Sequence, residues 1–292
     1  MNAIIFGASG QDGFYLQRLL SKKNINVIPV ARSVNEGFIT GNVGDTEFVF
    51  SLIRKYLPDY IFHLAAVSTT KHEHIFENND AIQKGTINIL EGTKLYNPKS
   101  RIFLSGSAMQ FKNDGKAINE STPFEASSAY SVQRISSVYA GQYYRNFFGL
   151  KVYAGYLFNH DSPLRSEKHI NQKISKMAKR IAAKVESKLI IGNLNVEKEF
   201  SFAGDIVEAM WTLVNQDSFY EAVLGSGISY PIRDWIDISF KLAGLNWQEY
   251  VQVDNSFVTE YSRLLSDPAL IKSTGWLPKV DFYQLAEMMY NS

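Results

Sequence analysis

The sequence predicts an α/β fold: a doubly wound parallel sheet in the first half of the chain, followed by a smaller C-terminal α/β domain. Its 292 residues are enough for about two domains. Before residue 160, short apolar stretches alternate with longer stretches whose apolar residues recur at helical spacing. After residue 160 this alternation stops and the elements become smaller. We therefore expect one domain over residues 1–160 and a second mainly over 161–292, with some later segments returning to the first.

The strands expected in the first half are short, branched and apolar on both faces, as strands buried in a parallel sheet are. They cover Ala3–Phe6, Asn26–Val30, Tyr60–Leu64, Arg101–Leu104 and Lys151–Phe158. The helices expected between them cover Asp12–Lys22, Thr46–Tyr56, Ile82–Tyr96 and Ser131–Phe147. This strand–helix–strand order predicts right-handed crossovers, with helices on both faces of the sheet.

The second half is expected to contain a basic helix, a short strand and two further helices. These cover, in order, Ile170–Lys184, Lys188–Ile191, Asp205–Asn215 and Phe282–Tyr290. No repeat, low-complexity segment or Pro-rich linker separates the two halves. The second domain should therefore pack against the first.

The composition excludes several classes of protein. With 45% hydrophobic and 20% charged residues, the chain is neither disordered nor a coiled coil. The 30 Lys and Arg residues nearly balance the 29 Asp and Glu residues, so we expect no nucleic-acid partner and no membrane surface. The absence of cysteine excludes disulfides, thiol nucleophiles and Cys-ligated metal sites. With no apolar leader or long apolar run, we expect a cytoplasmic protein.

The five histidines are scattered along the chain, and only His72 and His74 are spaced so that they could chelate a metal ion. No third ligand for such a site is evident in the sequence. We expect a solvated loop at these positions and no metal.

Three glycines follow the first strand, in Gly7-Ala-Ser-Gly10-Gln-Asp-Gly13. They allow a tight turn and let a pyrophosphate approach the amides at the positive end of a helix. This is the pattern of a Rossmann-type dinucleotide site; the alternative is an ordinary glycine turn. The second strand ends at Arg32-Ser33, where NAD enzymes usually have an acid. A cation and a hydroxyl suit a 2′-phosphate, so NADP(H) is expected, unless Arg32 is only a solvated surface residue.

Two hydroxyl groups are candidates for catalysis. Ser107 lies on the loop just after a predicted strand, and Tyr130-Ser-Val-Gln-Arg134 opens the long predicted helix. A hydroxyl pair beside a nicotinamide could move a proton while the cofactor moves a hydride. Arg134 lies one helical turn after Tyr130, which makes the two a sensible acid–base unit, although Tyr-x-x-x-Arg on a helix is usually a surface pair.

Together with His63-Leu-Ala-Ala66, these motifs resemble those of the extended short-chain dehydrogenases/reductases, the NAD-dependent epimerase/dehydratase family. Five segments, spread over nearly the whole chain, are similar to the GDP-mannose 4,6-dehydratase branch. They are Gly10-Gln-Asp-Gly13, Leu157-Phe-Asn-His-Asp-Ser-Pro-Leu-Arg165, Gly192-Asn-Leu-Asn195, Asp205-Ile-Val-Glu-Ala-Met-Trp211 and Gly275-Trp-Leu-Pro278. The Leu-Phe-Asn-His stretch is the most specific of these.

The resemblance implies a set of residues for each ligand. Cofactor contacts would come from Gly7, Gly10, Gln11, Asp12, Gly13, Arg32, Asn42, Val43, Leu64, Ala65, Ser68, Tyr130 and Arg134. Substrate contacts would come from Ser107, Asn159, Lys173, Gly192, Lys198, Arg233 and Glu260. The two lysines are reasonable partners for a diphosphate. The alternative interpretation of each substrate residue is that it lies on the surface and binds no ligand.

Three positions and one loop depart from the family. Arg134 replaces a lysine; it keeps the charge and can bind the cofactor ribose, but it cannot give up its proton. Met109 stands where the dehydratases have an acid, so no obvious group removes the C5 proton of the sugar. Phe257 stands where a phosphate-binding arginine is expected. The segment after the second strand is shorter than the loop that helps the dehydratases form a tetramer.

We therefore expect an NADP(H)-dependent oxidoreductase acting at C4 of a nucleotide sugar, with GDP favoured. It would be a 4-keto reductase or 4-dehydrogenase in deoxysugar or surface-polysaccharide synthesis, with Tyr130 moving the proton, Ser107 holding the C4 oxygen and Arg134 anchoring the ribose. One alternative is a GDP-mannose 4,6-dehydratase-type lyase that uses some other acid. Another is a catalytically weakened protein that binds NADP and a sugar nucleotide. We expect a homodimer, formed by the helices Ile82–Tyr96 and Ser131–Phe147.

Overall fold

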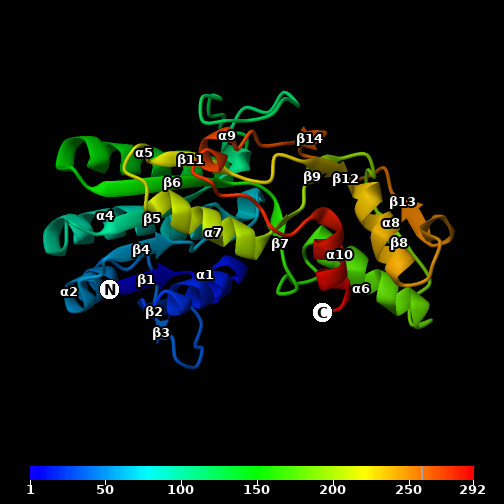
Figure 1. Ribbon diagram of the computed structural model, residues 1–292, viewed down its shortest axis with the longest axis horizontal. Coiled ribbons are helices and arrows are strands. Elements are labelled where there is room, and N and C mark those ends of the chain that lie inside the picture. The colour runs from blue at the N-terminus through cyan, green and yellow to red at the C-terminus, as the bar shows by residue number, and fades with distance from the viewer. Residues whose placement is uncertain (258) are drawn as a thin grey trace.

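The computed structural model describes residues 1–257 and 259–292, and its central feature is a sheet of seven parallel strands (Figure 1). The strands are β1 (Asn2–Phe6), β2 (Asn26–Ala31), β3 (Ile39–Thr40), β4 (Tyr60–His63), β5 (Arg101–Ser107), β6 (Lys151–Leu157) and β11 (Glu221–Leu224). Their order across the sheet is β11-β6-β5-β4-β1-β2-β3. The direction of winding reverses between β1 and β4, so the carboxyl ends of these two strands border a crevice suited to a ligand. The predicted doubly wound sheet is confirmed.

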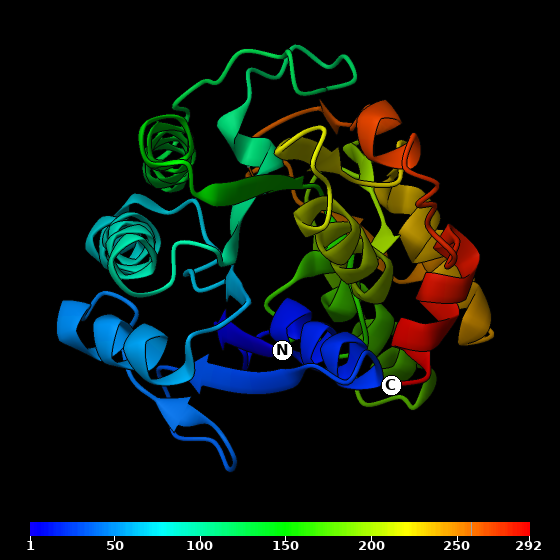
Figure 2. The same cartoon turned by 60° about the vertical axis from the view of Figure 1, so that its left-hand side comes forward.

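Helices cover both faces of the sheet, as Figure 2 shows. One layer consists of α1 (Gln11–Lys22) and α7 (Ala203–Val214); the other consists of α2 (Thr46–Tyr56), α4 (Gly85–Tyr96) and α5 (Ala129–Phe148). Successive strand residues point to opposite faces. In β1, Ala3 and Ile5 pack under α1 and α7, whereas Ile4 and Phe6 pack under α2 and α4. Because both faces are buried, the strand is apolar throughout, which is why it could be recognised in the sequence.

The remaining elements gather beside the carboxyl ends of the sheet (Figure 1). The helices here are α6 (Ile170–Ala182), α8 (Ile232–Leu242) and α10 (Phe282–Tyr290). The strands are β7 (His160–Asp161), β8 (Leu189–Ile191), β9 (Glu197–Glu199), β10 (Ser201–Phe202), β12 (Ser229–Pro231), β13 (Val251–Val253) and β14 (Arg263–Leu264). They form a three-stranded sheet β12-β9-β14 and the pairs β10-β7 and β13-β8. A separate aromatic core, in which Phe200 stacks on the buried Trp235, holds this part together.

The chain returns to the central sheet after it has built part of this second region. Helix α7 packs against α1, and β11 pairs in parallel with β6 at the edge of the sheet. The sequence analysis predicted a helix in the place of α7 but no strand at β11. The division of the chain near residue 160 into a cofactor domain and a substrate domain stays a prediction.

Two boundaries differ from those expected in a way that affects the site. Strand β5 continues to Ser107 because Ser105 and Ser107 pair with Gly155 and Leu157 of β6. Ser107 is thus the last residue of a strand and not part of the loop after it. The helix expected from Ile82 begins as α4 only at Gly85, after a π-helical segment Asn79–Lys84.

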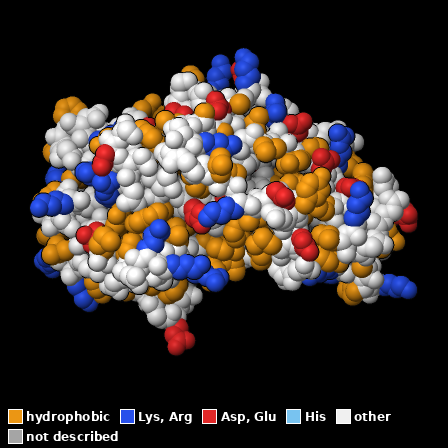
Figure 3. Space-filling view, in the orientation of Figure 1, with side chains coloured by type: hydrophobic (Ala, Val, Ile, Leu, Met, Phe, Trp, Pro, Cys, Tyr) orange, Lys and Arg blue, Asp and Glu red, His pale blue; other side chains and the backbone are white. Residues whose placement is uncertain are grey.

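The short helical pieces connect the larger elements. They are η1 (His72–His74), α3 (Ile75–Asn78), η3 (Ala108–Gln110), η4 (Trp247–Glu249) and α9 (Ala269–Lys272). On the face shown in Figure 3, basic and acidic side chains are scattered among polar and apolar ones, in keeping with the net charge of +1. Within the described residues, no helix combines the length and the apolar character that crossing a membrane requires.

Candidate active site

The glycine turn between β1 and α1 forms a close-fitting cradle. Gly7 has a φ of +90°, and a Cβ atom there would lie 2.7 Å from the backbone nitrogen of Ala65. At Gly13 a Cβ atom would lie 2.6 Å from the Cα atom of Ala8. Helix α1 then begins without a side-chain cap, since Gly10 stands at the N-cap position. The amides of its first turn are thus left to bind an anion, which is what the pyrophosphate of a dinucleotide requires.

A cavity of about 330 Å³ extends from this turn along the carboxyl ends of β1, β2 and β4. Arg32 and Ser33 lie at its edge, just beyond β2, and no acidic residue takes their place. Eleven of the residues proposed for the cofactor line it: Gly7, Gly10, Gln11, Asp12, Gly13, Arg32, Asn42, Val43, Leu64, Ala65 and Ser68. The residues present therefore fit a dinucleotide, and the structure brings them together from separate segments of the chain.

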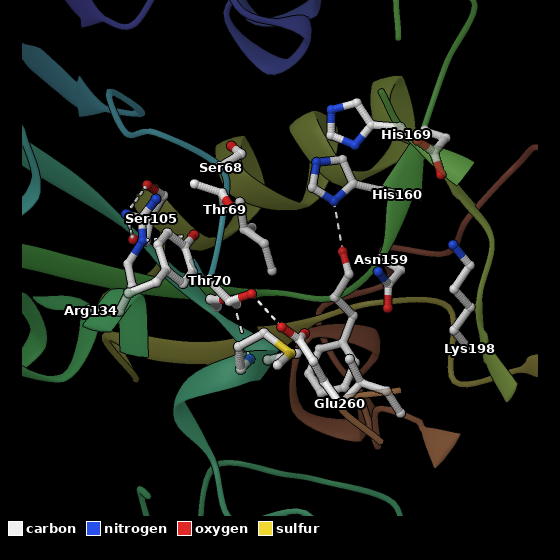
Figure 4. Close-up of a pocket in the computed structure, with 18 of the residues that line it drawn as sticks. Ser68, Thr69, Thr70, Ser105, Arg134, Asn159, His160, His169, Lys198 and Glu260 are labelled. Atoms are coloured by element: carbon white, nitrogen blue, oxygen red, sulfur yellow. Dashed lines mark hydrogen bonds between the residues drawn. The ribbon is translucent and has the colours of Figure 1, made fainter. Parts of the chain in front are cut away.

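A second cavity, of about 450 Å³, adjoins the first at the carboxyl ends of β5 and β6 (Figure 4). Asp12, Leu64, Ser68 and Arg165 line both cavities. All three proposed catalytic residues, Ser107, Tyr130 and Arg134, line this second one. Tyr130 and Arg134 reach it because α5 begins at Ala129, where Ser128 and Ser131 cap the helix through reciprocal hydrogen bonds.

Arg134 is held tightly by protein groups, with only 4% of its surface exposed. Its Nε donates to the hydroxyl oxygen of Tyr130 at 3.0 Å, and its Nη1 donates to the Ser105 hydroxyl at 2.8 Å and to the Ser105 carbonyl. Its guanidinium also lies 5.1 Å from the centre of the Tyr130 ring. Arg134 thus ties the start of α5 to the end of β5, which fixes the position of the tyrosine hydroxyl.

An ion pair that the sequence analysis missed joins the two regions at this point. His160 Nε2 lies 2.9 Å from Asp12 Oδ1, and its Nδ1 bonds to the carbonyl of Phe158 at 2.7 Å. Burial alone would raise the pKa of Asp12, but the charge and hydrogen bond of His160 outweigh it and hold the value at about 2. Burial opposes charge on His160 as well, yet Asp12 raises the pKa of this imidazole. The only signal in the sequence was the Leu-Phe-Asn-His motif.

The residues proposed for the substrate are divided between two cavities. Ser107, Asn159, Lys198 and Glu260 line the cavity that holds Tyr130. Lys173, Gly192, Lys198 and Glu260 line a third cavity, of about 400 Å³. Arg233 lines neither; it is exposed and donates to the Asn195 side chain at 3.1 Å.

Phe257, at the position where the resemblance expects an arginine, forms a wall of the third cavity. Its Cβ would lie 2.9 Å from a Cβ atom at Gly192. Because this wall is apolar, it cannot replace the charge of an arginine. Lys198 is left as the buried cation beside the site, only 7% exposed and lining both substrate cavities (Figure 4).

The comparisons with known proteins agree with this geometry. The model of the family described as GDP-mannose 4,6 dehydratase matches residues 4–289. GDP-mannose 4,6 dehydratase 1 of Arabidopsis thaliana is 30% identical over 318 residues, which cover 98% of this chain and 88% of the relative.

Two solved structures show the same fold. The UDP-glucose 4-epimerase of Thermus thermophilus in complex with NAD has a TM-score of 0.86 at 19% identity, covering 100% of this chain and 98% of that one. The structure of RMD from Pseudomonas aeruginosa complexed with NADPH has a TM-score of 0.86 at 17% identity, covering 99% and 96%. These likenesses at low identity concern the fold, whereas the family match extends over nearly the whole sequence.

Proposed function

This chain belongs to the GDP-mannose 4,6-dehydratase family of extended short-chain dehydrogenases/reductases, and from that premise we propose that it dehydrates a GDP-linked sugar across C5 and C6 after oxidation at C4. Membership of the family makes it an epimerase/dehydratase-type enzyme of nucleotide sugars. The expectation of redox chemistry at C4 without elimination is not confirmed, and the comparisons favour its dehydratase alternative. The observation that carries the proposal is the placement of Ser107, Tyr130 and Arg134 on a cavity that adjoins the dinucleotide cavity.

When bound, a nicotinamide cofactor takes up or returns a hydride at a sugar carbon. The chain's own part at C4 is to move a proton: the Tyr130 oxygen receives it from the 4-hydroxyl, and Ser107 holds the C4 oxygen. Arg134 already donates to the Tyr130 oxygen, so it stabilises the phenolate form of Tyr130, which is the form that accepts this proton. Because Arg134 is buried and always charged, this support does not depend on a proton of its own.

We propose NADP(H) as the cofactor. Similar folds bind NAD in one solved structure and NADPH in another, which supports a nicotinamide cofactor without selecting between the two. The selection rests on Arg32 and Ser33 at the end of β2, where a cation and a hydroxyl suit the 2′-phosphate.

The diphosphate of the substrate is assigned to Lys198. Its ammonium forms no hydrogen bond or ion pair within residues 1–257 and 259–292, although the side chain is buried. Burial lowers its pKa, which Asp161 partly offsets. A diphosphate placed between the two substrate cavities would supply the missing counter-charge.

We also propose a homodimer formed through α4 and α5. Both helices expose large apolar side chains on the outer surface, and exposed apolar patches of this kind mark interfaces. The exposed residues are Ile87, Leu95, Val132, Tyr139, Tyr143, Phe147 and Phe148.

The test is to incubate the protein with NADP⁺ and GDP-mannose and to follow the product by mass spectrometry. Loss of one water from the sugar is expected. Tyr130→Phe should keep cofactor binding and lose turnover by a factor of about a hundred to ten thousand. Tyr283→Phe, at an exposed tyrosine of α10 that lines none of the three cavities, is the control and should leave turnover unchanged.

Met109 favours a second candidate function, oxidation or reduction at C4 alone, because a thioether beside the site cannot carry a proton. That enzyme would convert a 4-keto nucleotide sugar while every oxygen of the sugar is retained. If the protein binds NADP and a nucleotide sugar but converts neither, it is instead the catalytically weakened binding protein that the sequence analysis gave as an alternative.

A further inference from the structure

Elimination of water needs an acid–base group that Met109 cannot provide. Once C4 is a ketone, the proton on C5 is acidic, and a nearby base must remove it while the 6-hydroxyl leaves with a proton. Met109 lies in the short helix η3, directly after Ser107, and lines the cavity of Tyr130. Its thioether can neither take nor give a proton. If the proposed dehydration occurs, another side chain of this cavity has to act.

Three carboxylates line this cavity among the residues that the structure describes, and two of them are already engaged. Asp12 is paired with His160, and its pKa is held at about 2. Asp161 accepts hydrogen bonds on both oxygens, from Arg165 at 3.1 Å and from Asn171 at 2.5 Å. Carboxylates engaged in this way are poorly placed to exchange protons with a sugar.

Glu260 is the third carboxylate. It is exposed to solvent, and its Oε1 accepts a hydrogen bond from the hydroxyl of Thr70 (Figure 4). Its Oε2 has no hydrogen-bond partner among residues 1–257 and 259–292. One oxygen of this carboxylate is thus oriented by the protein, and the other is available to a ligand.

The hydrogen bond between Thr70 and Glu260 joins residues 190 positions apart in the sequence. Thr70 belongs to the segment after β4, two residues beyond Ser68, which lines both the cofactor cavity and this one. Glu260 comes from the segment just before β14. Glu260 therefore lines the same cavity as Tyr130 and is tied to the segment that also lines the cofactor cavity.

The imidazoles of the cavity are less suitable. Figure 4 shows His160 and His169 together on the side of the cavity away from Arg134 and Ser105. His160 has both ring nitrogens bonded. Burial and the neighbouring Arg165 lower the pKa of His169, which makes this ring a weaker base for removing the C5 proton.

We propose that Glu260 is the acid–base residue of the elimination step and takes the role that Met109 cannot fill. The Glu260 carboxylate removes the proton from C5, and the electron pair of that C–H bond forms the C5–C6 double bond. The C6–O bond breaks, and the leaving oxygen takes the proton from the Glu260 carboxylic acid and departs as water. The C4 ketone is unchanged, so this step needs neither an oxidant nor a reductant. The assignment rests on the proposed dehydratase function.

The test follows exchange at C5, which requires no turnover of the cofactor. GDP-4-keto-6-deoxymannose is incubated in deuterated water with wild type, Glu260→Gln or Glu249→Gln, and deuterium at C5 is measured by NMR against an enzyme-free sample. Glu260→Gln should lower the enzyme-dependent exchange rate at least about a hundredfold. Glu249→Gln, which removes an exposed carboxylate of η4, should not change it.

A second variant separates a chemical role from a structural one. Met109→Glu, introduced into the Glu260→Gln protein, restores a carboxylate in the same cavity and should recover part of the lost exchange. The exchange rates are compared at saturating nucleotide sugar, fixed for each protein by calorimetric titration, so that a change in the affinity of Glu260→Gln does not enter the comparison. Equal exchange in wild type and Glu260→Gln, or no exchange above the enzyme-free sample in wild type, overturns the assignment. Oxidation at C4 by Glu260→Gln would show that the first step survives, whereas wild type that binds no nucleotide sugar would refute the proposed function and Glu260 with it.

Discussion

Replacing Lys198 with methionine should stabilise the ligand-free protein and at the same time weaken its binding of a nucleotide sugar. Lys198 is 7% exposed, and among the described residues its ammonium forms no hydrogen bond or ion pair and contacts only the face of the Phe200 ring, 5.2 Å from the ring centre. The charge of Asp161 favours the ammonium, but the oxygens of Asp161 are already bonded to Arg165 and Asn171. Methionine is also long and unbranched, so it can fill the same space without a charge.

The magnitude follows from this environment. A buried polar group without a partner costs about 1–3 kcal/mol, and more when it is charged. Lys198→Met should therefore raise the free energy of unfolding by about 1–3 kcal/mol, and for a chain of 292 residues each kcal/mol raises the Tm by roughly 1.5–2 °C. A charge-assisted hydrogen bond to the diphosphate is worth about 1.5–3 kcal/mol, so Kd should rise roughly 10- to 150-fold.

The pH dependence has a definite sign. Burial lowers the pKa of Lys198 below its ordinary value of 10.5, which Asp161 opposes and Arg165 reinforces. The ammonium therefore destabilises the folded state below its folded pKa, and that cost disappears as the pH rises from the folded pKa towards 10.5. The stability advantage of Lys198→Met should shrink over the same alkaline range.

Thermal unfolding with and without excess GDP-mannose, together with calorimetric titration, measures both effects. Lys188→Met removes an exposed lysine that lines none of the three cavities and should change neither Tm nor Kd. Nucleotide sugar should raise the Tm of wild type more than that of Lys198→Met. A variant that is less stable than wild type and binds the nucleotide sugar equally well would refute the reasoning.

Three further predictions concern the cofactor, the ion pair and the assembly. Arg32→Ala should weaken NADP(H) binding roughly ten- to a hundredfold in calorimetry and leave NAD binding unchanged; equal affinity of wild type for both cofactors would contradict it. Because Asp12 raises the pKa of His160 above 6.5 and its own pKa is lowered from 3.8 to about 2, their pair stabilises the fold fully between pH 3.8 and 6.5 and less as the pH rises through the folded pKa of His160. His160→Gln should thus lower stability by about 1–3 kcal/mol in acidic urea titrations and by less in alkaline ones, and a loss independent of pH would count against the pair. Phe147→Glu should dissociate the dimer in sedimentation experiments and leave the enzymatic activity of the monomer. If the wild type sediments only as a monomer, the proposed dimer is refuted.

Much of the central sheet and its helices was predictable because their signals are local. Strands such as β1 are buried on both faces, so the run Ala3–Phe6 is apolar without interruption. Helix α2 agrees with the expected range residue for residue, since Asp45 caps its start and Leu57 ends it in a left-handed conformation before Pro58. Strand β11 was missed because its four residues carry no strand signal of their own and depend on pairing with β6.

The same distinction applies to the candidate site, where some features are local in the sequence and others depend on tertiary contacts. The sequence by itself determined which chemical groups are available: the glycines that a helix N-terminus needs, the hydroxyls of Ser107 and Tyr130, and the thioether at Met109. Spacing of four residues on a helix was enough to pair Tyr130 with Arg134.

Only the tertiary structure decided which partner each of these groups has. The guanidinium of Arg134 is directed to Ser105, His160 reaches Asp12 across 148 positions, and Thr70 donates to Glu260 across 190. Lys173 and Lys198 were both candidates for the diphosphate from the sequence, and only folding showed that Lys198 is buried without a hydrogen bond or ion pair among the described residues. Such contacts depend on how the second region packs on the sheet, and no short-range periodicity encodes them. For this reason the functional groups of the site could be predicted from the sequence, whereas their hydrogen-bond and charge partners were decided by the tertiary structure.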